Sequence, residues 1–115
     1  GYLTAVEITQ LKLKADLAVL SACETGLGKI YGGEGVSGLT SSFLVAGANR
    51  VLVSLWPVSD AGTMIFMMGM YELVEKRGYT YDKAVNEMKR RFIQKEFGEE
   101  FSSPDIWAPF ILTGR

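Results

Sequence analysis

The sequence predicts an α/β fold, and three features carry this prediction. Two short apolar runs with strand-forming residues, 17–21 (LAVLS) and 51–55 (VLVSL), lie about 29 residues apart from strand to strand, which suits one βαβ unit. Helical patterns follow the second run, and the chain closes with a third apolar run near residues 108–113. Apolar runs without polar alternation are typical of buried parallel strands. We therefore expect a small, mainly parallel sheet with flanking helices.

The segment before the first strand carries a helix signal. Thr4 and Glu7 have the spacing of a capping box, which predicts a short helix through about Leu11. After the strand at 17–21, glycines recur often enough in residues 22–35 to predict a long, pliable loop.

Three further helices follow from apolar spacing and capping residues. The first occupies residues 36–47 and ends at a glycine. The second begins at Ser59 or Asp60, either of which can cap it, runs to about residue 77 and stops at Gly78. The third spans residues 80–95 and is amphipathic. Because the first half of the second helix (MIFMMGM) is apolar nearly all round, we expect it to need cover on more than one side.

The C-terminal part combines a polar loop with a final strand. Residues 96–105 (EFGEEFSSPD) contain turn-forming residues and predict a loop. Within the last strand, Pro109 has no N–H to donate to a neighbouring strand. We therefore expect Pro109 at a strand start or on an edge strand of the sheet.

Composition excludes several classes of function. Twelve basic residues balance 13 acidic ones for a net charge of −1, so no electrostatic footprint for nucleic acid or an anionic membrane is expected. No apolar run approaches the roughly 20 residues of a membrane span, and the N-terminus lacks the pattern of a signal peptide. One cysteine and no histidine leave no basis for predicting a metal or another cofactor. The lone thiol favours a cytoplasmic location, since it cannot form an internal disulfide.

Cys23 is the most chemically distinctive residue. It follows the predicted strand 17–21, at the carboxyl end where sites collect in open α/β sheets. A thiol held there by a rigid strand can act as a nucleophile, and its backbone N–H can donate to an oxyanion. The alternative from position alone is that Cys23 is a small, buried and inert packing residue.

Three motifs then point to a family. The stretches LSACETGLG, GEGVSGLTSSFLVAGANRVLVSLWPVSDAGT and IWAPFILTG resemble the C-terminal part of CHAT domains, caspase-like cysteine peptidases often fused to tetratricopeptide repeats. More distantly, the layout resembles separase. The resemblance implies part of a three-layer αβα caspase-like fold, and a dyad in which an upstream histidine activates the cysteine thiol. It also implies a protein or peptide substrate and repeat-type neighbours.

The resemblance assigns roles to a few residues. Cys23 takes the nucleophile's position, and its loop, with Gly26 and Gly28, takes that of the oxyanion loop. Asp60 falls where separase-like enzymes place an acid that receives a basic substrate side chain. The remaining residues that we assign to substrate binding are Trp56 and Glu34. Two alternatives stay open: Asp60 as a helix N-cap, and Trp56, like Trp107, as part of the core.

The absence of histidine is the main departure from the family pattern. We expect residues 1–115 to form a single domain, the C-terminal half of a CHAT domain whose histidine-bearing half lies upstream. We also expect no useful peptidase activity from this chain alone. The alternative is a catalytically dead module of the same fold that binds other proteins. The Met-rich helix is the candidate surface for homodimerisation.

Overall fold

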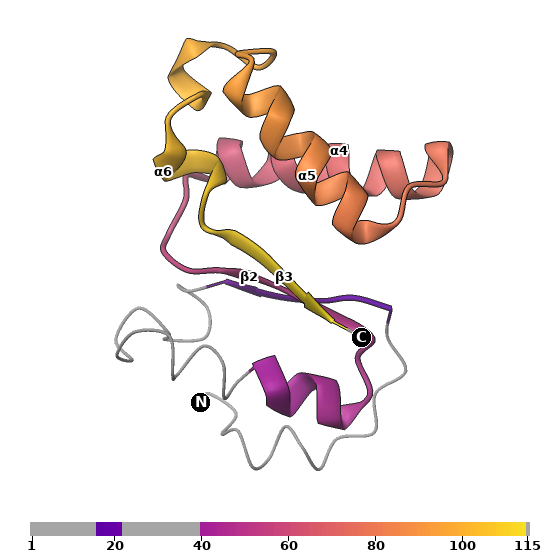
Figure 1. Cartoon of the computed structure of the whole chain (residues 1–115). Helices are drawn as coiled ribbons and strands as arrows, with labels where there is room; N and C mark the ends of the chain where they lie inside the picture. The colour runs from indigo at the N-terminus through magenta and orange to yellow at the C-terminus, as the bar shows by residue number, and fades with distance from the viewer. Residues whose placement is uncertain (1–15, 22–39, 115) are drawn as a thin grey trace. The chain divides into compact units, whose positions relative to one another are not determined.

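The computed structural model describes residues 16–21 and 40–114 of the chain (Figure 1). In chain order its elements are β1 (Ala18–Ser21), a helical segment at 40–46, β2 (Arg50–Ser54), α4 (Asp60–Arg77), α5 (Tyr81–Ile93), the 3-10 helix η2 (Glu99–Phe101), α6 (Pro104–Trp107) and β3 (Phe110–Gly114). The predicted α/β class is confirmed. The helix predicted at residues 4–11 and the loop predicted at 22–35 lie outside the described residues.

The chain divides into two compact units, Gly1–Pro57 with Ile111–Arg115, and Val58–Phe110. The first unit contains the sheet, except for Phe110, and the helical segment 40–46, whereas the second contains the remaining helices. None of the helices described in either unit is both long and apolar enough to cross a membrane.

The three strands lie in the order β1-β2-β3. β1 and β2 pair in parallel, with Ala18 opposite Val51 and Ser21 opposite Ser54, as predicted for a βαβ unit. The last residue of β3, Gly114, lies against the start of β2, where a Cβ on it would come within 2.9 Å of the Asn49 carbonyl oxygen. β3 therefore runs antiparallel to β2 (Figure 1), and the sheet is mixed.

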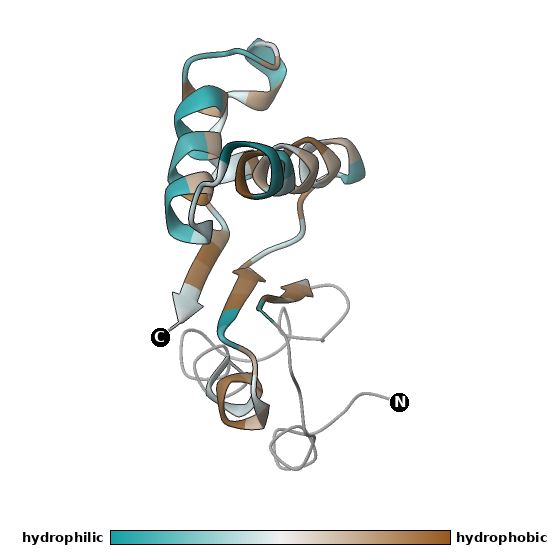
Figure 2. Cartoon of the chain, turned by 90° about the vertical axis from the view of Figure 1, so that its right-hand side faces the viewer, coloured by the Kyte–Doolittle hydropathy of each residue, from teal (hydrophilic) through white to brown (hydrophobic). Residues whose placement is uncertain are grey.

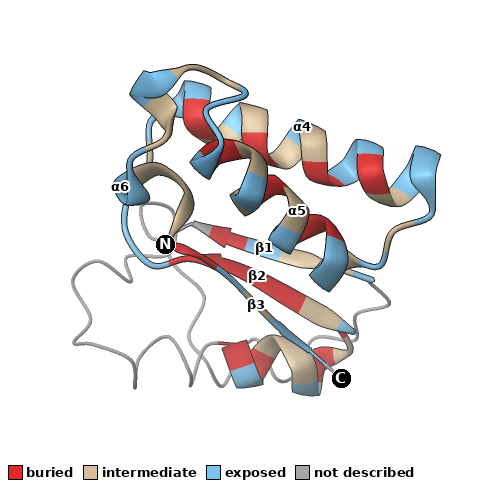
Figure 3. Ribbon diagram, turned by 45° about the horizontal axis from the view of Figure 1, so that its top comes forward, coloured by how far each residue is buried: buried red, intermediate tan, exposed pale blue. Residues whose placement is uncertain are grey.

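The core of the first unit follows from the apolar composition of its strands, which Figure 2 shows in the hydrophobic colour. Its central members are Leu20, Ala48, Val51 and Val53, with Ala18, Phe43 and Leu44 packed against them. Figure 3 shows the contrast between β2, which is buried along most of its length, and β3, which is mostly exposed. The segment 40–46 ends at Gly47, whose φ of 123° suits a glycine, at the predicted position.

The helices of the second unit begin and end at the capping residues that the sequence offers. Ser59 is the N-cap of α4, and its Oγ accepts a hydrogen bond from the Gly62 N–H at 3.1 Å. α4 stops at Gly78, which has a φ of 70°. Thr80 caps α5 through a 3.4 Å hydrogen bond from the Lys83 N–H.

Aromatic rings form the core of the second unit. Phe66 of α4 stacks on Phe110 with ring centroids 4.2 Å apart, and on Phe92 of α5 at 5.9 Å. All three side chains are buried. Gly69 of α4 lies so close to the Met88 side chain that a Cβ at this position would overlap it. The missing side chain therefore allows α4 and α5 to pack tightly.

The prediction of a loop over residues 96–105 was wrong in part, because two short helices lie in or begin within it. η2 occupies Glu99–Phe101, and α6 begins at Pro104, directly after Ser103. The Ser103 Oγ accepts a hydrogen bond from the Asp105 N–H at 3.4 Å, so the residues taken for a turn cap a helix instead. Pro109 precedes β3 directly, in agreement with the prediction of a strand start.

Candidate functional site

The described part of the candidate site is the edge of the sheet where β1 and β2 end. Because these strands are parallel and Ser21 lies opposite Ser54, the chain leaves both strands at the same edge. Cys23 follows Ser21 by two residues in the sequence. Cys23 itself, Gly26, Gly28 and Glu34 lie outside the described residues. The geometry of the edge is therefore given by the end of β2 and the residues that follow it.

Ser54 ends β2 and organises the turn that follows. Its side chain is buried, and its Oγ donates a 2.8 Å hydrogen bond to the backbone carbonyl oxygen of Trp56. A serine hydroxyl that bonds backbone two residues away favours a turn over continued strand. The next residue, Pro57, further restricts the Trp56 backbone to extended conformations. The backbone at Trp56 is thus restrained from both sides.

Trp56 is 39% exposed. The alternative of a core role for this residue is therefore wrong. The reason is that β2 ends at Ser54, so Trp56 lies beyond the last residue that the sheet covers. Trp107 is half-buried rather than core, and its indole Nε1 donates to the Ser102 carbonyl oxygen at 2.9 Å.

Asp60 is the first residue of α4 in the second unit, and it is exposed. It is not the N-cap, because Ser59 makes the capping hydrogen bond, so that interpretation of Asp60 was wrong. A carboxylate in the first turn of a helix interacts favourably with the N-terminal end of the helix dipole. Asp60 is thus a solvent-exposed acidic residue in the first turn of α4, and it does not cap the helix.

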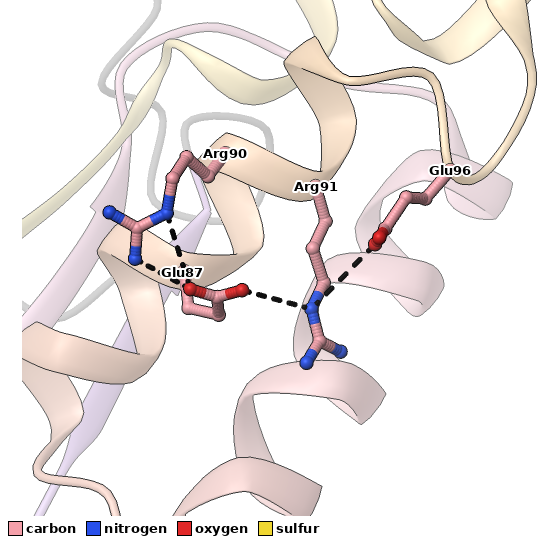
Figure 4. A network of polar contacts seen from close by, with 4 residues as sticks. All are labelled: Glu87, Arg90, Arg91 and Glu96. Atoms are coloured by element: carbon pink, nitrogen blue, oxygen red, sulfur yellow. Dashed lines mark hydrogen bonds and ion pairs between the residues drawn. The ribbon is translucent and has the colours of Figure 1, made fainter.

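The charged residues of α5 and the turn after it form a separate polar network (Figure 4). Glu87 pairs with Arg90 at 2.5 Å and with Arg91 at 3.3 Å, and Arg91 also reaches Glu96 at 3.7 Å. Hydrogen bonding from Arg90 is the main reason why the pKa of Glu87 lies below its ordinary value. Burial lowers the pKa of Lys89. These pairs stabilise a helix surface, and the described residues contain no cluster of metal-ligating side chains.

The fold and the edge together define an α/β protein with a candidate site at the carboxyl ends of a parallel strand pair. The CHAT domain family matches residues 1–115. The chain is also 37% identical to human tetratricopeptide repeat protein 28, and 35% identical to the Mus musculus protein of that name, over 112 residues, or 97% of the chain. The chain spans about 4% of the length of these curated relatives. No solved structure matches it. The chain belongs to the CHAT domain family, a caspase-like family.

One residue of this edge was missed by sequence reasoning. Ser54 was taken only as part of an apolar strand, although it is the one hydroxyl-bearing residue in the run VLVSL. A polar residue in a buried strand needs a hydrogen-bond partner, and this requirement was the available signal. The hydrogen-bond partner of Ser54, the Trp56 carbonyl oxygen, could not be identified from the sequence.

Proposed function

We propose that this chain is the nucleophile-bearing part of a caspase-like cysteine endopeptidase domain, with the Cys23 thiol as the attacking group. Membership of the CHAT family supports the class of the domain. The observation that carries the proposal is the parallel register of β1 and β2, which places Ser21, two residues before Cys23 in the sequence, opposite Ser54 at the end of β2. In α/β sheets, this edge is where reacting groups are gathered.

The proposed reaction needs a base that this chain does not contain. A thiol with an ordinary pKa near 8.5 is ionised only to a few per cent at neutral pH, and general-base help contributes about 10²- to 10⁴-fold in rate. The 115 residues include no histidine. We therefore propose that an imidazole from another part of the longer protein takes the thiol proton, and that residues 1–115 are one half of the complete domain. A reducing, cytoplasmic setting would keep the single thiol free.

Two exposed residues, Trp56 in the first unit and Asp60 in the second, each carry a side chain that suits part of a peptide substrate. Trp56 offers an apolar surface at the end of β2, and Asp60 is an exposed carboxylate that can bind an arginine side chain through two parallel hydrogen bonds. Cys23 with Gly26 and Gly28 would form the oxyanion loop, and Glu34 would contact substrate. The names of the relatives suggest tetratricopeptide repeats, and we propose such repeats as neighbouring domains in a longer protein.

The test uses the protein with its natural flanking sequence and a fluorogenic peptide that carries arginine at the cleaved bond. We expect Cys23→Ala to abolish cleavage, because no nucleophile remains. We expect Asp60→Asn to lower kcat/KM for this peptide by about 10- to 100-fold, the usual worth of a hydrogen bond to a charged group. The same loss on a matched glutamine peptide would contradict a role for Asp60 in binding arginine.

A scaffold that dimerises through α4 is the second candidate, and one observation favours it. Met64 and Met68 are 59% and 65% exposed, and Tyr71 completes an i, i+4, i+7 stripe on the face of α4 opposite Phe66. Exposed apolar stripes of this kind mark interaction surfaces. Helical pairing of two copies across the stripe would bury all three side chains.

Sedimentation velocity of the chain tests this second candidate. We expect self-association at high concentration that the double variant Met64→Ser, Met68→Ser removes. Lys76→Ser is the matched control, since it alters an exposed residue of the same helix outside the stripe. A clean monomer for the unmodified chain rules out the homodimer.

A further inference from the structure

Ser54 holds the backbone of an exposed aromatic residue. We propose that the Ser54 hydroxyl is a positioning group that fixes Trp56 as a rigid platform for an apolar substrate side chain. The proposal rests on the peptidase function proposed above and adds to it a residue that governs substrate affinity. The one observation that carries it is the 2.8 Å hydrogen bond from the Ser54 Oγ to the Trp56 carbonyl oxygen.

The free-energy cost of burying a serine hydroxyl at this position indicates that Ser54 has a specific role. The residues before it, Val51, Leu52 and Val53, are fully buried, and Ser54 continues this buried run. Burial of a hydroxyl is unfavourable unless the hydroxyl finds a partner, whereas a small apolar residue would have no such need. The partner that it finds lies in the segment that leaves the sheet, so the bond fixes the direction of the chain at this exit.

The restraint has a consequence for Trp56. Its carbonyl is held by Ser54, and Pro57 limits its backbone to extended conformations. A side chain on a fixed backbone loses less conformational entropy when a ligand packs on it, so a rigid aromatic residue binds more tightly than a mobile one. Trp56 is exposed at the edge where both parallel strands end, which is where a substrate would lie.

A purely structural role is the competing explanation. In that case Ser54 would only satisfy its own hydrogen bond, and its loss would affect stability but not substrate binding through Trp56. A double-mutant cycle separates the two explanations, because a positioning residue acts only while the residue that it positions is present.

The experiment uses the protein with its natural flanking sequence and the probe acetyl-Val-Leu-Arg acyloxymethyl ketone. The Cys23 thiolate displaces the carboxylate of this probe and forms a thioether. We expect Ser54→Ala to raise KI, the apparent dissociation constant of the probe, by about 3- to 10-fold, which is the range for a lost hydrogen bond. The rate constant of inactivation, kinact, should not change. Iodoacetamide, which carries no peptide, should label wild type and Ser54→Ala at the same rate.

Two further variants complete the cycle, and two more serve as controls. Trp56→Ala should raise KI at least as much as Ser54→Ala does, and the double variant should have the same KI as Trp56→Ala alone. Ser54→Thr retains the hydroxyl and should restore the KI of the wild type. Ser102→Ala is the matched control, because it removes a comparable hydroxyl-to-carbonyl hydrogen bond, to Glu99 at 2.7 Å, in the second unit.

The results distinguish failure of this inference from failure of the proposed function. If the probe labels wild type and Ser54→Ala with equal KI, or if the effects of Ser54→Ala and Trp56→Ala add, the positioning role is overturned and the peptidase proposal stands. If neither the probe nor iodoacetamide labels wild type faster than a free thiol at pH 6, the peptidase proposal fails, and the inference fails with it.

Discussion

Helices α4 and α5 lie in the same unit and pack on each other, yet they expose different kinds of residue to solvent. The outer face of α5 carries charged residues, among them Asp82, Lys83 and Arg90, and Glu87 pairs with its neighbours on this helix. The outer face of α4 carries Met64 and Met68. Both helices bury an apolar inner face, which contains Phe66 in α4 and Phe92 in α5.

The difference shows what an apolar pattern can and cannot indicate. In α5, the polar residues leave a single face to bury, so the pattern alone predicts which residues lie inside. In α4, apolar residues surround the first half of the helix, and the pattern gives no preferred face. The structure selects the face with Phe66, Met70 and Leu73. The methionines left outside are therefore not explained by the core of the described unit and are the proposed interaction surface.

The largest effect on stability is expected from Phe66→Ala, on the buried face of α4. The ring is fully buried and stacks on two other phenylalanines, so its removal should cost about 3–5 kcal/mol of the free energy of unfolding, measured by urea denaturation. Met68→Ala is the control on the exposed face, where a change within about 0.5 kcal/mol is expected. A comparable loss for both variants would mean that the outer face is covered as well.

The ends of the two helices provide a second test of intermediate size. α4 stops at Gly78 with a φ of 70°, whereas the chain after α5 places a lysine, Lys95, at a φ of 64°. Gly78→Ala should destabilise by about 1–2 kcal/mol, because a Cβ is strained in this region. Lys95→Gly should stabilise the protein by up to about 1 kcal/mol for the same reason. Changes of the same sign in thermal unfolding would contradict this account.

Much of the fold could be predicted because its signals are local. The runs at 17–21 and 51–55 became β1 and β2, and Gly78 ends α4 as expected, since apolar runs and capping residues act within a few positions. The short helix α6 was missed because the same Ser103-Pro104-Asp105 signal suits a turn and a helix start. Which one forms is decided by contacts such as that between the Trp107 indole and the Ser102 carbonyl.

The candidate site was less predictable, since its properties depend on where a strand stops. An exposed Trp56 and a hydrogen-bonded Ser54 follow only once β2 is known to end at residue 54. A one-residue shift of the strand end would change what the sheet covers. The family resemblance supplied the role of Cys23, which the residues alone left undecided between a nucleophile and inert packing.

The smallest change in stability is expected at Glu87 of α5. Because pairing with Arg90 and Arg91 lowers the pKa of Glu87 in the folded protein, the charged carboxylate stabilises the fold above its ordinary pKa of 4.5. This contribution is lost as the pH falls through the lowered value. Glu87→Gln should therefore reduce the Tm slightly at pH 7, and the difference from wild type should shrink as the pH falls below 4.5 and the Glu87 carboxylate becomes protonated.

The matched control for this effect is Glu75→Gln, which makes the same charge change at an exposed position on α4. We expect a smaller shift from it, because the network of Figure 4 belongs to α5 and the turn after it. High salt should remove most of the difference between the two variants, since exposed pairs are screened. Equal shifts for both variants at low salt would mean that overall charge, and not the pairing of Glu87, distinguishes the polar face of α5 from the apolar face of α4.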